Sequence, residues 1–481
     1  MPESLLLENV WLIFHLGLCL YRYLRLIVHC ISYWRYNSVS PKQEPKYTSK
    51  DVTVVIPTIH NDFPELRGSL QSILACNPAK LILVTTAGRY YALEKMVATL
   101  RPSDDTTIVT LYVGKANKRL QMCRALEEKH IQTAITALAD DDVEWPPTLM
   151  PWLLAPFEDD KMGGVGTCQR VKRVDGDPMT RIFNWLGAAY IERRNFEISA
   201  THNIDGGTSC MSGRTGAYRT EILKSYDFLD GFKNEKWGNY ILNADDDNFI
   251  TRWLVAHQWK TWVQYNPECE IETTLETNVK FLYQCCRWAR SNWRSNWTSL
   301  VHERYVLTQQ PWCTYALHLA TFTSLAFITD PLLLLSCWWG AADWAPRVRY
   351  ALLGGELVFM FCFAKVVKLV GLFRKNPRDI VFLPVSIIFG YFHGLIKLYA
   401  LFTLKQTSWG SRAGGDEHNQ FRLQEKPAPH ETMTTPAGPD MPDASYALSS
   451  QTRRVMISSH KHDANGCLDS RRPINLRSQA S

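Results

Sequence analysis

Two runs of three consecutive aspartates are the residues in this sequence best suited to chemistry. The first occupies residues 140–142, directly after the apolar run 137–139, and the second occupies residues 245–247. Carboxylates this close repel one another unless a cation compensates, so a hard divalent ion, Mg²⁺ or Mn²⁺, is their natural partner. One run could hold the metal while a carboxylate of the other acts as a general base. Taken alone, each run could instead be explained by helix capping, and the first also by a solvated turn.

A third group of polar residues surrounds Trp288. If residues 281–300 form a helix, Gln284, Arg287 and Trp288 lie on one face, at positions i, i+3 and i+4. Tryptophan offers a flat platform for a sugar ring, and glutamine and arginine offer hydrogen-bond donors. The same stretch also fits an amphipathic helix in the bilayer interface, with tryptophan and arginine as anchors. The two interpretations are compatible.

A fourth group, residues 115–119, is basic and follows Gly114. Its members Lys118 and Arg119 could bind a diphosphate, because cationic side chains form strong charge-assisted hydrogen bonds with phosphate oxygens. A solvated run of charges explains these residues equally well.

The pattern between residues 51 and 300 predicts the α/β domain that must position these groups. Residues 52–56 form a β-branched run stopped by Pro57, and residues 81–84 form a second apolar run, with helical spacing of apolar residues at 66–74 between them. Strands that alternate with helices predict a mainly parallel sheet, whose ligands gather at the carboxyl ends of the strands. The first aspartate run follows such a strand.

Four apolar stretches predict membrane helices around this domain. Basic residues follow the first stretch, and the positive-inside rule therefore places the catalytic domain in the cytosol. Asp330, Lys365, Lys368, His393 and Lys397 interrupt the later stretches, where such groups either line a bundle interior or snorkel. The predicted organisation is an anchor helix at 1–36, a linker at 37–50, a catalytic domain at 51–300 with an interfacial helix near 281–300, three transmembrane helices within 312–405 and a disordered tail at 413–481.

The composition excludes several other classes of protein. The 481 residues include 53 Lys and Arg against 47 Asp and Glu, and this net charge of +6 is too small for the electrostatic footprint of a nucleic-acid-binding protein. The mean hydropathy of −0.19 excludes a protein that lies mostly within a membrane. The 13 cysteines show no zinc-ligand spacing, which indicates reduced thiols.

Together these motifs resemble those of the membrane-bound family 2 glycosyltransferases, which include hyaluronan, chitin and cellulose synthases, and above all the fungal type 2 glycosyltransferases described as polysaccharide synthases. The resemblance covers about residues 50–412. It rests on P-T-I-H-N-D at 57–62, the basic run ending at Arg119, D-x-D at 140–142, S-G-R at 212–214, the pair Asp245-Asp246, Q-x-x-R-W at 284–288 and W-G-S-R at 409–412.

The resemblance implies a GT-A fold and an inverting, metal-dependent transfer from a UDP-sugar. Asp142 and Asp140 would hold the metal, and Asp246, with Asp245 beside it, would be the catalytic base. The nucleotide sugar would be bound by Pro57, Asp140, Lys118, Arg119 and Arg287. The acceptor would be bound by Ser212, Gly213, Arg214, Gln284, Arg287 and Trp288.

The function implied by the resemblance is that of a processive polysaccharide synthase of the plasma membrane. It would elongate a β-linked cell-wall or matrix glycan in the cytosol and export it through its own helices, with a UDP-sugar, a glycan acceptor and membrane lipids as partners and no nucleic acid. The alternative is a glycolipid synthase that resembles ceramide glucosyltransferase and adds one sugar to a lipid. A catalytically inactive scaffold is disfavoured, because a binding module needs no base beside a metal site.

Two features depart from the family pattern. Many relatives carry an aspartate after the second strand that contacts the uracil side of the donor, where this chain has Thr85 and Thr86. The resemblance therefore predicts recognition of the uracil less firmly than it predicts metal binding. An even number of spans, four, would also place Trp409 of the W-G-S-R motif outside the cytosol. If this motif gated the active site, it would have to lie on the cytosolic side. Either one apolar stretch is an interfacial or re-entrant helix, or this motif does not gate.

Overall fold

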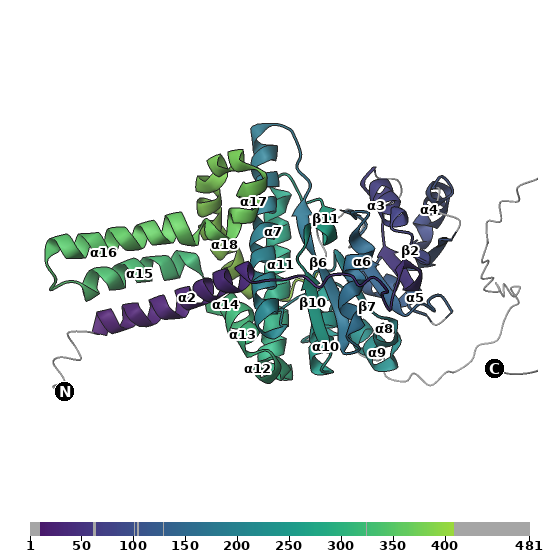
Figure 1. Cartoon of the computed structure of the whole chain (residues 1–481), viewed down its shortest axis with the longest axis horizontal. Helices are drawn as coiled ribbons and strands as arrows, with labels where there is room; N and C mark the ends of the chain where they lie inside the picture. The colour runs from purple at the N-terminus through teal and green to yellow at the C-terminus, as the bar shows by residue number, and fades with distance from the viewer. Residues whose placement is uncertain are drawn as a thin grey trace, which may run out of the picture. The chain divides into compact units, whose positions relative to one another are not determined.

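The computed structural model describes residues 10–60, 64–100, 102, 105–127, 129–323 and 325–407 (Figure 1). One large sheet forms the centre of the catalytic region, in the order β3-β2-β1-β4-β7-β6-β11-β5, with β10 beside β6. Its strands are β1 (Val52–Pro57), β2 (Lys80–Thr86), β3 (Thr107–Val113), β4 (Ile135–Ala139), β5 (Val143–Glu144), β6 (Met162–Val171), β7 (Thr215–Arg219), β10 (Lys260–Gln264) and β11 (Glu270–Thr273).

The strand directions confirm the predicted, mainly parallel sheet. β3, β2, β1 and β4 run parallel to one another, and β10 and β11 both pair with β6 in parallel. β7 runs antiparallel between β4 and β6, and β5 runs antiparallel to β11. The sheet is therefore mixed, and the sequence did not predict its antiparallel strands.

Helices cover both faces of the sheet. Val54 and Ile56 of β1 pack into a core with α3 (Pro64–Ala75), whereas Val55 packs into a second core with α10 (Asp246–Ala256). A strand buried on both faces has to be apolar at every position, which explains the continuous β-branched run that predicted it. The other helices of this region are α4 (Tyr90–Val97), α5 (Lys118–Ala125), α6 (Leu149–Leu154), α8 (Thr220–Lys224) and α9 (Tyr226–Asn234), and a small hairpin pairs β8 (Lys236–Trp237) with β9 (Tyr240–Ile241).

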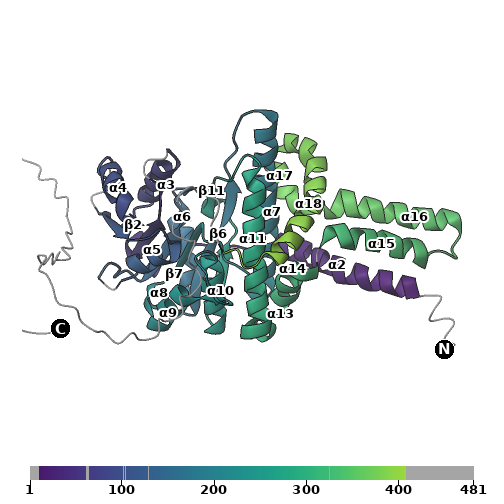
Figure 2. The same ribbon diagram turned by 180° about the vertical axis from the view of Figure 1, so that it is seen from behind.

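Two long helices join the sheet to the apolar helices. α7 (Pro178–Asp205) and α11 (Lys280–Trp297) stand between the sheet and the apolar helices in both views (Figures 1 and 2). Trp185 of α7 and Phe389 of α18 (Leu383–Phe402) belong to one apolar core, to which α11 also contributes. The catalytic region is therefore attached to the apolar helices by a packed core.

The apolar helices differ from the four spans expected. α2 (Val10–Trp34) and the helical segment Pro377–Phe402 are each long and apolar enough to cross a membrane. Pro311–Thr323 and Ala326–Gly340 add a third candidate only if this pair, bent by 91°, counts as one broken span. The described part of the chain therefore offers two or three spans by length and composition. The short helices of this pair are α13 (Pro311–Cys313), α14 (Ala320–Thr323) and α15 (Ala326–Gly340), preceded by α12 (Tyr305–Gln309).

The difference arises in the second of the three later apolar stretches, residues 350–373, which the sequence predicted to span the membrane. It is divided among α16 (Pro346–Val358), a π-helical segment (Phe359–Ala364), a 3-10 turn (Val367–Leu369) and α17 (Val370–Lys375). Lys365 Nζ lies 2.9 Å from Asp330 Oδ2, and Lys368 pairs with Glu197. Because both lysines are drawn toward carboxylates of other helices, the stretch breaks instead of continuing as one span.

The domain boundaries drawn from the sequence stay predictions. The expected interfacial helix near 281–300 coincides with α11. The tail at 413–481, the W-G-S-R motif at 409–412 and residues 61–62 of the first motif lie outside the described residues.

Candidate active site

The two aspartate runs meet at the side chain of Lys118. Its Nζ lies 2.8 Å from Asp140 Oδ1 and 2.9 Å from Asp246 Oδ2. Lys118 is the first residue of α5, and the Asn117 side chain caps this helix by accepting a hydrogen bond from the Leu120 backbone N–H. Carboxylates from two distant parts of the chain are thus held on one cation, so both runs belong to a single site.

Different elements position the two carboxylates. Asp140 follows β4, and its backbone N–H donates to the Arg214 carbonyl at 3.0 Å. Asp246 is the first residue of α10, where the helix dipole favours negative charge. The preceding residue, Asp245, has a left-handed φ of 65°, which few non-glycine residues adopt. This turn therefore depends on contacts that hold Asp245 in place.

Arg294 of α11 supplies those contacts. Its Nη2 and Nε lie 2.6 Å and 2.8 Å from Asp245 Oδ2, and both side chains are buried. Burial raises the pKa of Asp245, but the charge of Arg294 outweighs this effect and lowers the pKa below its ordinary value. Asp245 is thus an ionised residue that fixes the turn, and its neighbour Asp246 is the carboxylate that faces Lys118.

Asp246 has a different electrostatic environment. It is 4 % exposed, and burial raises its pKa above the ordinary value, an effect that Asp247 reinforces and Lys118 opposes. Burial lowers the pKa of Lys118, but Asp140 and Asp246 outweigh it and raise that pKa, so the lysine stays charged. A carboxylate with a raised pKa is a stronger base than an ordinary aspartate.

The members of the first run divide between the protein interior and the site. Thr58 Oγ1 donates to Asp141 Oδ2 at 2.7 Å, and Asp141 is buried. Asp142 Oδ2 accepts a hydrogen bond of 3.4 Å from Thr274, while Asp140 pairs with the lysine described above. The middle aspartate therefore anchors the run, and the outer two are the ones with access to a ligand.

The carboxylates of Asp140 and Asp142 fit a hard divalent cation. Mg²⁺ is typically held by one or two carboxylates, while substrate phosphates and water complete its shell. Among the described residues, three possible metal ligands converge only at His15, Cys19 and Glu356, on the apolar helices α2 and α16. The first aspartate run therefore suits an ion whose coordination a diphosphate completes, not an ion enclosed by protein ligands alone.

A stack of two aromatic rings and a guanidinium lies beside the acidic groups. Trp288 of α11 stacks on Tyr190 of α7 with ring centroids 5.1 Å apart, and the Arg214 guanidinium lies 5.5 Å from the centre of the Trp288 ring. Arg214 donates to Gln169 Oε1 at 3.0 Å and to Thr273 Oγ1 at 3.1 Å. Burial lowers the pKa of this arginine, and the carboxylates of the first run oppose the shift. The stack is therefore within electrostatic reach of that run.

α11 forms the helix predicted for the Q-x-x-R-W motif. Burial lowers the pKa of Arg287, and carboxylates of both aspartate runs oppose the shift, which puts this arginine near both. The Oε1 atom of Gln284 is buried and accepts no hydrogen bond within the described part of the chain. A buried acceptor without a donor is costly unless a ligand supplies one. On α11, Gln284 lies on the same helical face as Arg287 and Trp288, so a cation, an acceptor and an aromatic ring share this face.

Ser212 and Gly213 bring the backbone close to the lysine–carboxylate pair. A Cβ atom at Gly213 would lie 3.3 Å from Lys118 Nζ and 3.5 Å from Asp246 Oδ2. The Gly213 N–H donates to Asp247 Oδ2 at 3.3 Å, and the Ser212 hydroxyl accepts from the backbone two residues later. Any side chain at position 213 would press on the pair.

Comparison with known proteins assigns this site to a family. The family model described as "Glycosyltransferase like family 2" matches residues 49–291. A "Type 2 glycosyltransferase" of Gibberella zeae is 66% identical over 432 residues, which cover 90% of this chain and 81% of that protein. The chain belongs to the family 2 glycosyltransferases. It is therefore an enzyme that uses a nucleotide sugar as donor.

Further similarities extend to other members and to a solved structure. A "Type 2 glycosyltransferase" of Pyricularia oryzae is 64% identical, with 87% of this chain and 86% of that protein covered. A "Hyaluronan synthase" of Streptococcus pyogenes is 21% identical, with 75% and 83% covered. A mannosyltransferase from Pyrobaculum calidifontis in complex with GDP-Man and Mn²⁺ aligns with a TM-score of 0.50 at 16% identity, covering 82% of this chain and 99% of the other. This confirms the GT-A type of fold.

Arg119 has contacts that differ from the sequence-based expectation. It is 1 % exposed, and its guanidinium donates to the carbonyls of Phe232 and Ala244 and pairs with Glu235. With its donors taken up by protein groups, Arg119 ties α5 to the segment before α10. Pro57 has no polar side chain to offer a donor and ends β1 beside the residue that anchors the first aspartate run. In this glycosyltransferase we therefore assign Arg119 to positioning, and nucleotide-sugar binding by Pro57 stays a prediction.

Four residues of the site were given no role from the sequence: Tyr190, Arg294, and Thr58 and Asp247, which lie within the motifs at 57–62 and 245–247. Arg294 could have been found, since it lies seven residues after Arg287 and thus on the same helical face. Tyr190 carries no sequence signal, because nothing in an apolar helix marks the ring that stacks on a distant tryptophan. Thr58 and Asp247 were each adjacent to predicted residues.

Proposed function

We propose that this protein transfers a sugar from a UDP-sugar, with inversion at the anomeric carbon, to a hydroxyl group of a growing β-linked polysaccharide. The observation behind the proposal is the bridge that Lys118 forms between Asp140 and Asp246. It joins a carboxylate at a strand end to a buried carboxylate of the other run. Glycosyl transfer would use the first to hold a cation that neutralises charge on the leaving nucleotide and the second to take the proton that the acceptor loses.

The donor would lie at the carboxyl ends of β1 and β4, where parallel sheets bind their ligands. Asp140 and Asp142 would hold Mg²⁺ or Mn²⁺, which as a Lewis acid would neutralise charge on the departing diphosphate. Lys118 and Arg287 would add positive charge on the same side. UDP is proposed from the family resemblance, and the mannosyltransferase solved with GDP-Man makes GDP-mannose the competing donor to test.

Asp246 would act as the base. It would take the proton of the acceptor hydroxyl while that oxygen forms a bond to the anomeric carbon. The bond from this carbon to the diphosphate oxygen would break on the opposite face, and its electron pair would leave with the nucleoside diphosphate. Such an in-line displacement converts an α-linked donor into a β-linked product. The raised pKa of Asp246 supports this role.

The acceptor would be held on the opposite side by α11. The Trp288 ring, backed by Tyr190, would carry the terminal sugar, since an aromatic face packs well on a sugar ring. The buried oxygen of Gln284 would accept a hydrogen bond from a sugar hydroxyl. Arg214, Ser212 and Gly213 would line the same side.

This arrangement supports synthesis at a membrane. α11 packs against α18, which lies within a segment long and apolar enough to span. We propose that the catalytic region lies in the cytosol, that the chain is an integral protein of the plasma membrane, and that the glycan leaves through the chain's own helices.

A glycolipid synthase is the second candidate, and the number of spans favours it. The described residues offer two or three candidate spans, fewer than the four expected from the sequence. Fewer helices are then available to enclose a channel for the glycan. A lipid acceptor needs only access from the bilayer to the groups on α11.

Product analysis separates the two candidates. Purified full-length protein with Mn²⁺ and a panel of labelled UDP-sugars, with GDP-mannose alongside, should yield a labelled polymer whose anomeric carbons are β-configured by NMR. A lipid-linked monosaccharide would establish the second candidate instead. Retention of the donor's anomeric configuration, or no transfer from any donor above the level of Asp246→Asn, would refute the proposed reaction.

A further inference from the structure

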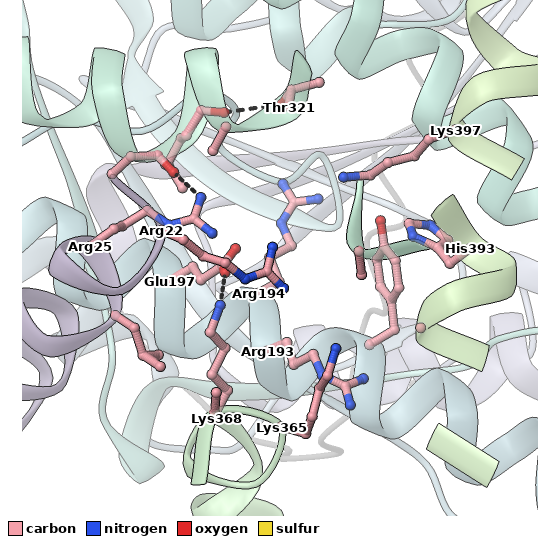
Figure 3. Close-up of a pocket in the computed structure, with 18 of the residues that line it drawn as sticks. Arg22, Arg25, Arg193, Arg194, Glu197, Thr321, Lys365, Lys368, His393 and Lys397 are labelled. Carbon is pink, nitrogen blue, oxygen red and sulfur yellow. Dashed lines mark hydrogen bonds and ion pairs between the residues drawn. The ribbon is translucent and has the colours of Figure 1, made fainter. Parts of the chain in front are cut away.

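A cavity of about 380 Å³ lies among the apolar helices and α7, next to the residues assigned to transfer (Figure 3). α2, α7 and α18 form its walls, together with Ala326 and residues within 316–321 and 360–368. Four of the five polar groups that interrupt the apolar stretches of the sequence are part of its lining: Lys365, Lys368, His393 and Lys397. Of the two alternatives for these groups, lining a bundle interior is the one that the structure supports.

The lining of this cavity is strongly cationic. Among the described residues, seven cationic side chains line it: Arg22, Arg25, Arg193, Arg194, Lys365, Lys368 and Lys397. Glu197 is the one carboxylate of the lining, and it pairs with Lys368. A further carboxylate, Asp330, pairs with Arg22 and Lys365. Seven cations against these two carboxylates leave an excess of five positive charges.

Several of the cations have only neutral partners or none. Arg25 and Arg194 donate to backbone carbonyls at 2.8 Å and 3.1 Å. Lys397 Nζ has neither a hydrogen bond nor an ion pair in the described part of the chain, and Figure 3 shows it pointing into the cavity. The Nε2 atom of His393 is buried and likewise has no partner there. Like charges in a partly enclosed, weakly polar space repel one another strongly, so the cavity suits an anion.

The anion must bring several negative charges into a small volume. A phosphate or diphosphate group does so, and arginine forks bind its oxygens through paired hydrogen bonds. A carboxylated glycan carries at most one carboxylate on each ring of ordinary uronic acids, and few rings fit into about 380 Å³. The excess charge therefore favours phosphate.

A second, smaller cavity indicates where the rest of such a ligand lies. It measures about 120 Å³ and shares Arg22, Arg25 and Ala320 with the first. Its other lining residues include Leu18 and Tyr21 of α2, which is long and apolar enough to span a membrane. A hydrocarbon chain that leaves the cationic cavity past the two arginines would thus pass along a membrane-type helix.

We propose that the cationic cavity binds the phosphate or diphosphate headgroup of an anionic membrane lipid, whose hydrocarbon chain leaves past Arg22 and Arg25. Tyr190 connects this site with the acceptor side, because it lines the cavity and also stacks on Trp288. If the proposed transfer reaction holds, an acceptor attached to such a lipid is held beside the Trp288 ring. Binding of the headgroup itself requires no turnover.

Native mass spectrometry of the full-length protein in lipid nanodiscs, without nucleotide sugar, tests the proposal. Discs made of equal parts phosphatidylcholine and phosphatidic acid are compared with discs of phosphatidylcholine alone. The wild type should retain phosphatidic acid in preference to phosphatidylcholine. The variant Arg193→Gln/Lys397→Gln should bind it at least about tenfold more weakly, because charge-assisted hydrogen bonds are lost.

A control, matched in charge to the single variant Lys397→Gln, removes one positive charge elsewhere on the apolar helices. Arg347 of α16 is exposed and does not line the cavity, so Arg347→Gln should retain phosphatidic acid like the wild type. If the double variant fails to fold, as judged by its thermal unfolding, Lys397→Gln alone serves, because the Lys397 Nζ has no partner to lose among the residues that the structure describes. Equal retention of both lipids by the wild type, or unchanged binding in the folded variant, would overturn the proposal.

Two competitors distinguish the sources of negative charge. Inorganic diphosphate that binds as tightly as the lipid would show that the hydrocarbon chain contributes nothing, and oligogalacturonate that binds more tightly would assign the cavity to a carboxylated glycan. Either result refutes a lipid site. Asp246→Asn should retain the lipid fully, so failure of the proposed reaction and failure of the lipid site remain distinguishable.

Discussion

The acidic site and the cationic cavity are joined through Tyr190 but differ in how far their charges are paired. In the acidic site the charges are matched within the protein: Asp140 and Asp246 share Lys118, and Asp245 has Arg294. In the cavity, seven cations face two carboxylates. The acidic site compensates the charges of these aspartates within the protein, whereas the excess positive charge of the cavity calls for a bound anion. Substitutions of acidic residues should therefore have opposite consequences in the two regions.

The largest effect is expected from Asp246→Asn. The amide cannot take the acceptor proton, so the rate of sugar transfer should fall about a thousandfold, within the range that a lost general base costs. The amide keeps the size of the carboxylate, and nucleotide-sugar binding, measured by calorimetry, should therefore be retained. Asp227→Asn on the exposed side of α9 is the matched control and should transfer at the wild-type rate. Wild-type transfer by Asp246→Asn would remove the base assignment.

A smaller effect is expected from Asp142→Asn. Changes even in the surroundings of metal ligands cost roughly tenfold to a hundredfold in metal affinity, so loss of a ligand should weaken Mn²⁺-dependent binding of the nucleotide at least as much. Binding measured with Mn²⁺ and with excess chelator should differ strongly in the wild type and little in the variant. An unchanged response to Mn²⁺ would separate Asp142 from the metal. Asp227→Asn again serves as the control.

Lys118 and Arg119 show how far the sequence alone reaches. Strand-end carboxylates such as Asp140 were predictable, because an apolar run that stops at an acidic residue marks the ligand edge of a parallel sheet. Two neighbouring basic residues at a helix start, however, point in directions about 100° apart, and nothing local tells which one faces the site. The structure turns Lys118 to the carboxylates and buries Arg119 against Glu235.

The apolar helices also have features that depend on residues far apart in the sequence. Their hydropathy predicted an anchor helix at 1–36 and three spans within 312–405, and the described residues hold two single helices long and apolar enough to span, Val10–Trp34 and Pro377–Phe402. The break near Lys365 and Lys368 depends on Asp330 and Glu197, which lie in other helices. The left-handed turn at Asp245 depends in the same way on Arg294. Contacts between distant segments decided these features, and no pattern within a single segment encodes them.

The pH dependence of the transfer rate tests whether Asp246 acts as the base and whether Lys118 lowers its pKa. Asp246 must be ionised to act as a base, so activity should be present above its pKa and lost as the pH falls through it. Because burial raises this pKa, the loss should occur at higher pH than for an ordinary aspartate. Lys118→Met removes the cation that opposes the rise, and the acid limb of its residual rate should move to still higher pH. The exposed Lys115→Met is the control, and an identical limb in all three proteins would contradict the coupling.

The smallest effect is expected in the cavity, where removal of a carboxylate should help binding. Glu197 is the lining carboxylate and pairs with Lys368, so Glu197→Gln frees this lysine for a phosphate headgroup. The Glu197 side chain is 29% exposed, and partly exposed pairs contribute little, so phosphatidic acid should bind only about threefold more tightly. Glu221→Gln on the exposed part of α8 should leave the affinity unchanged. A loss of affinity in Glu197→Gln would mean that this carboxylate orders the cations instead of competing with the headgroup, and the contrast between the two regions would then fail.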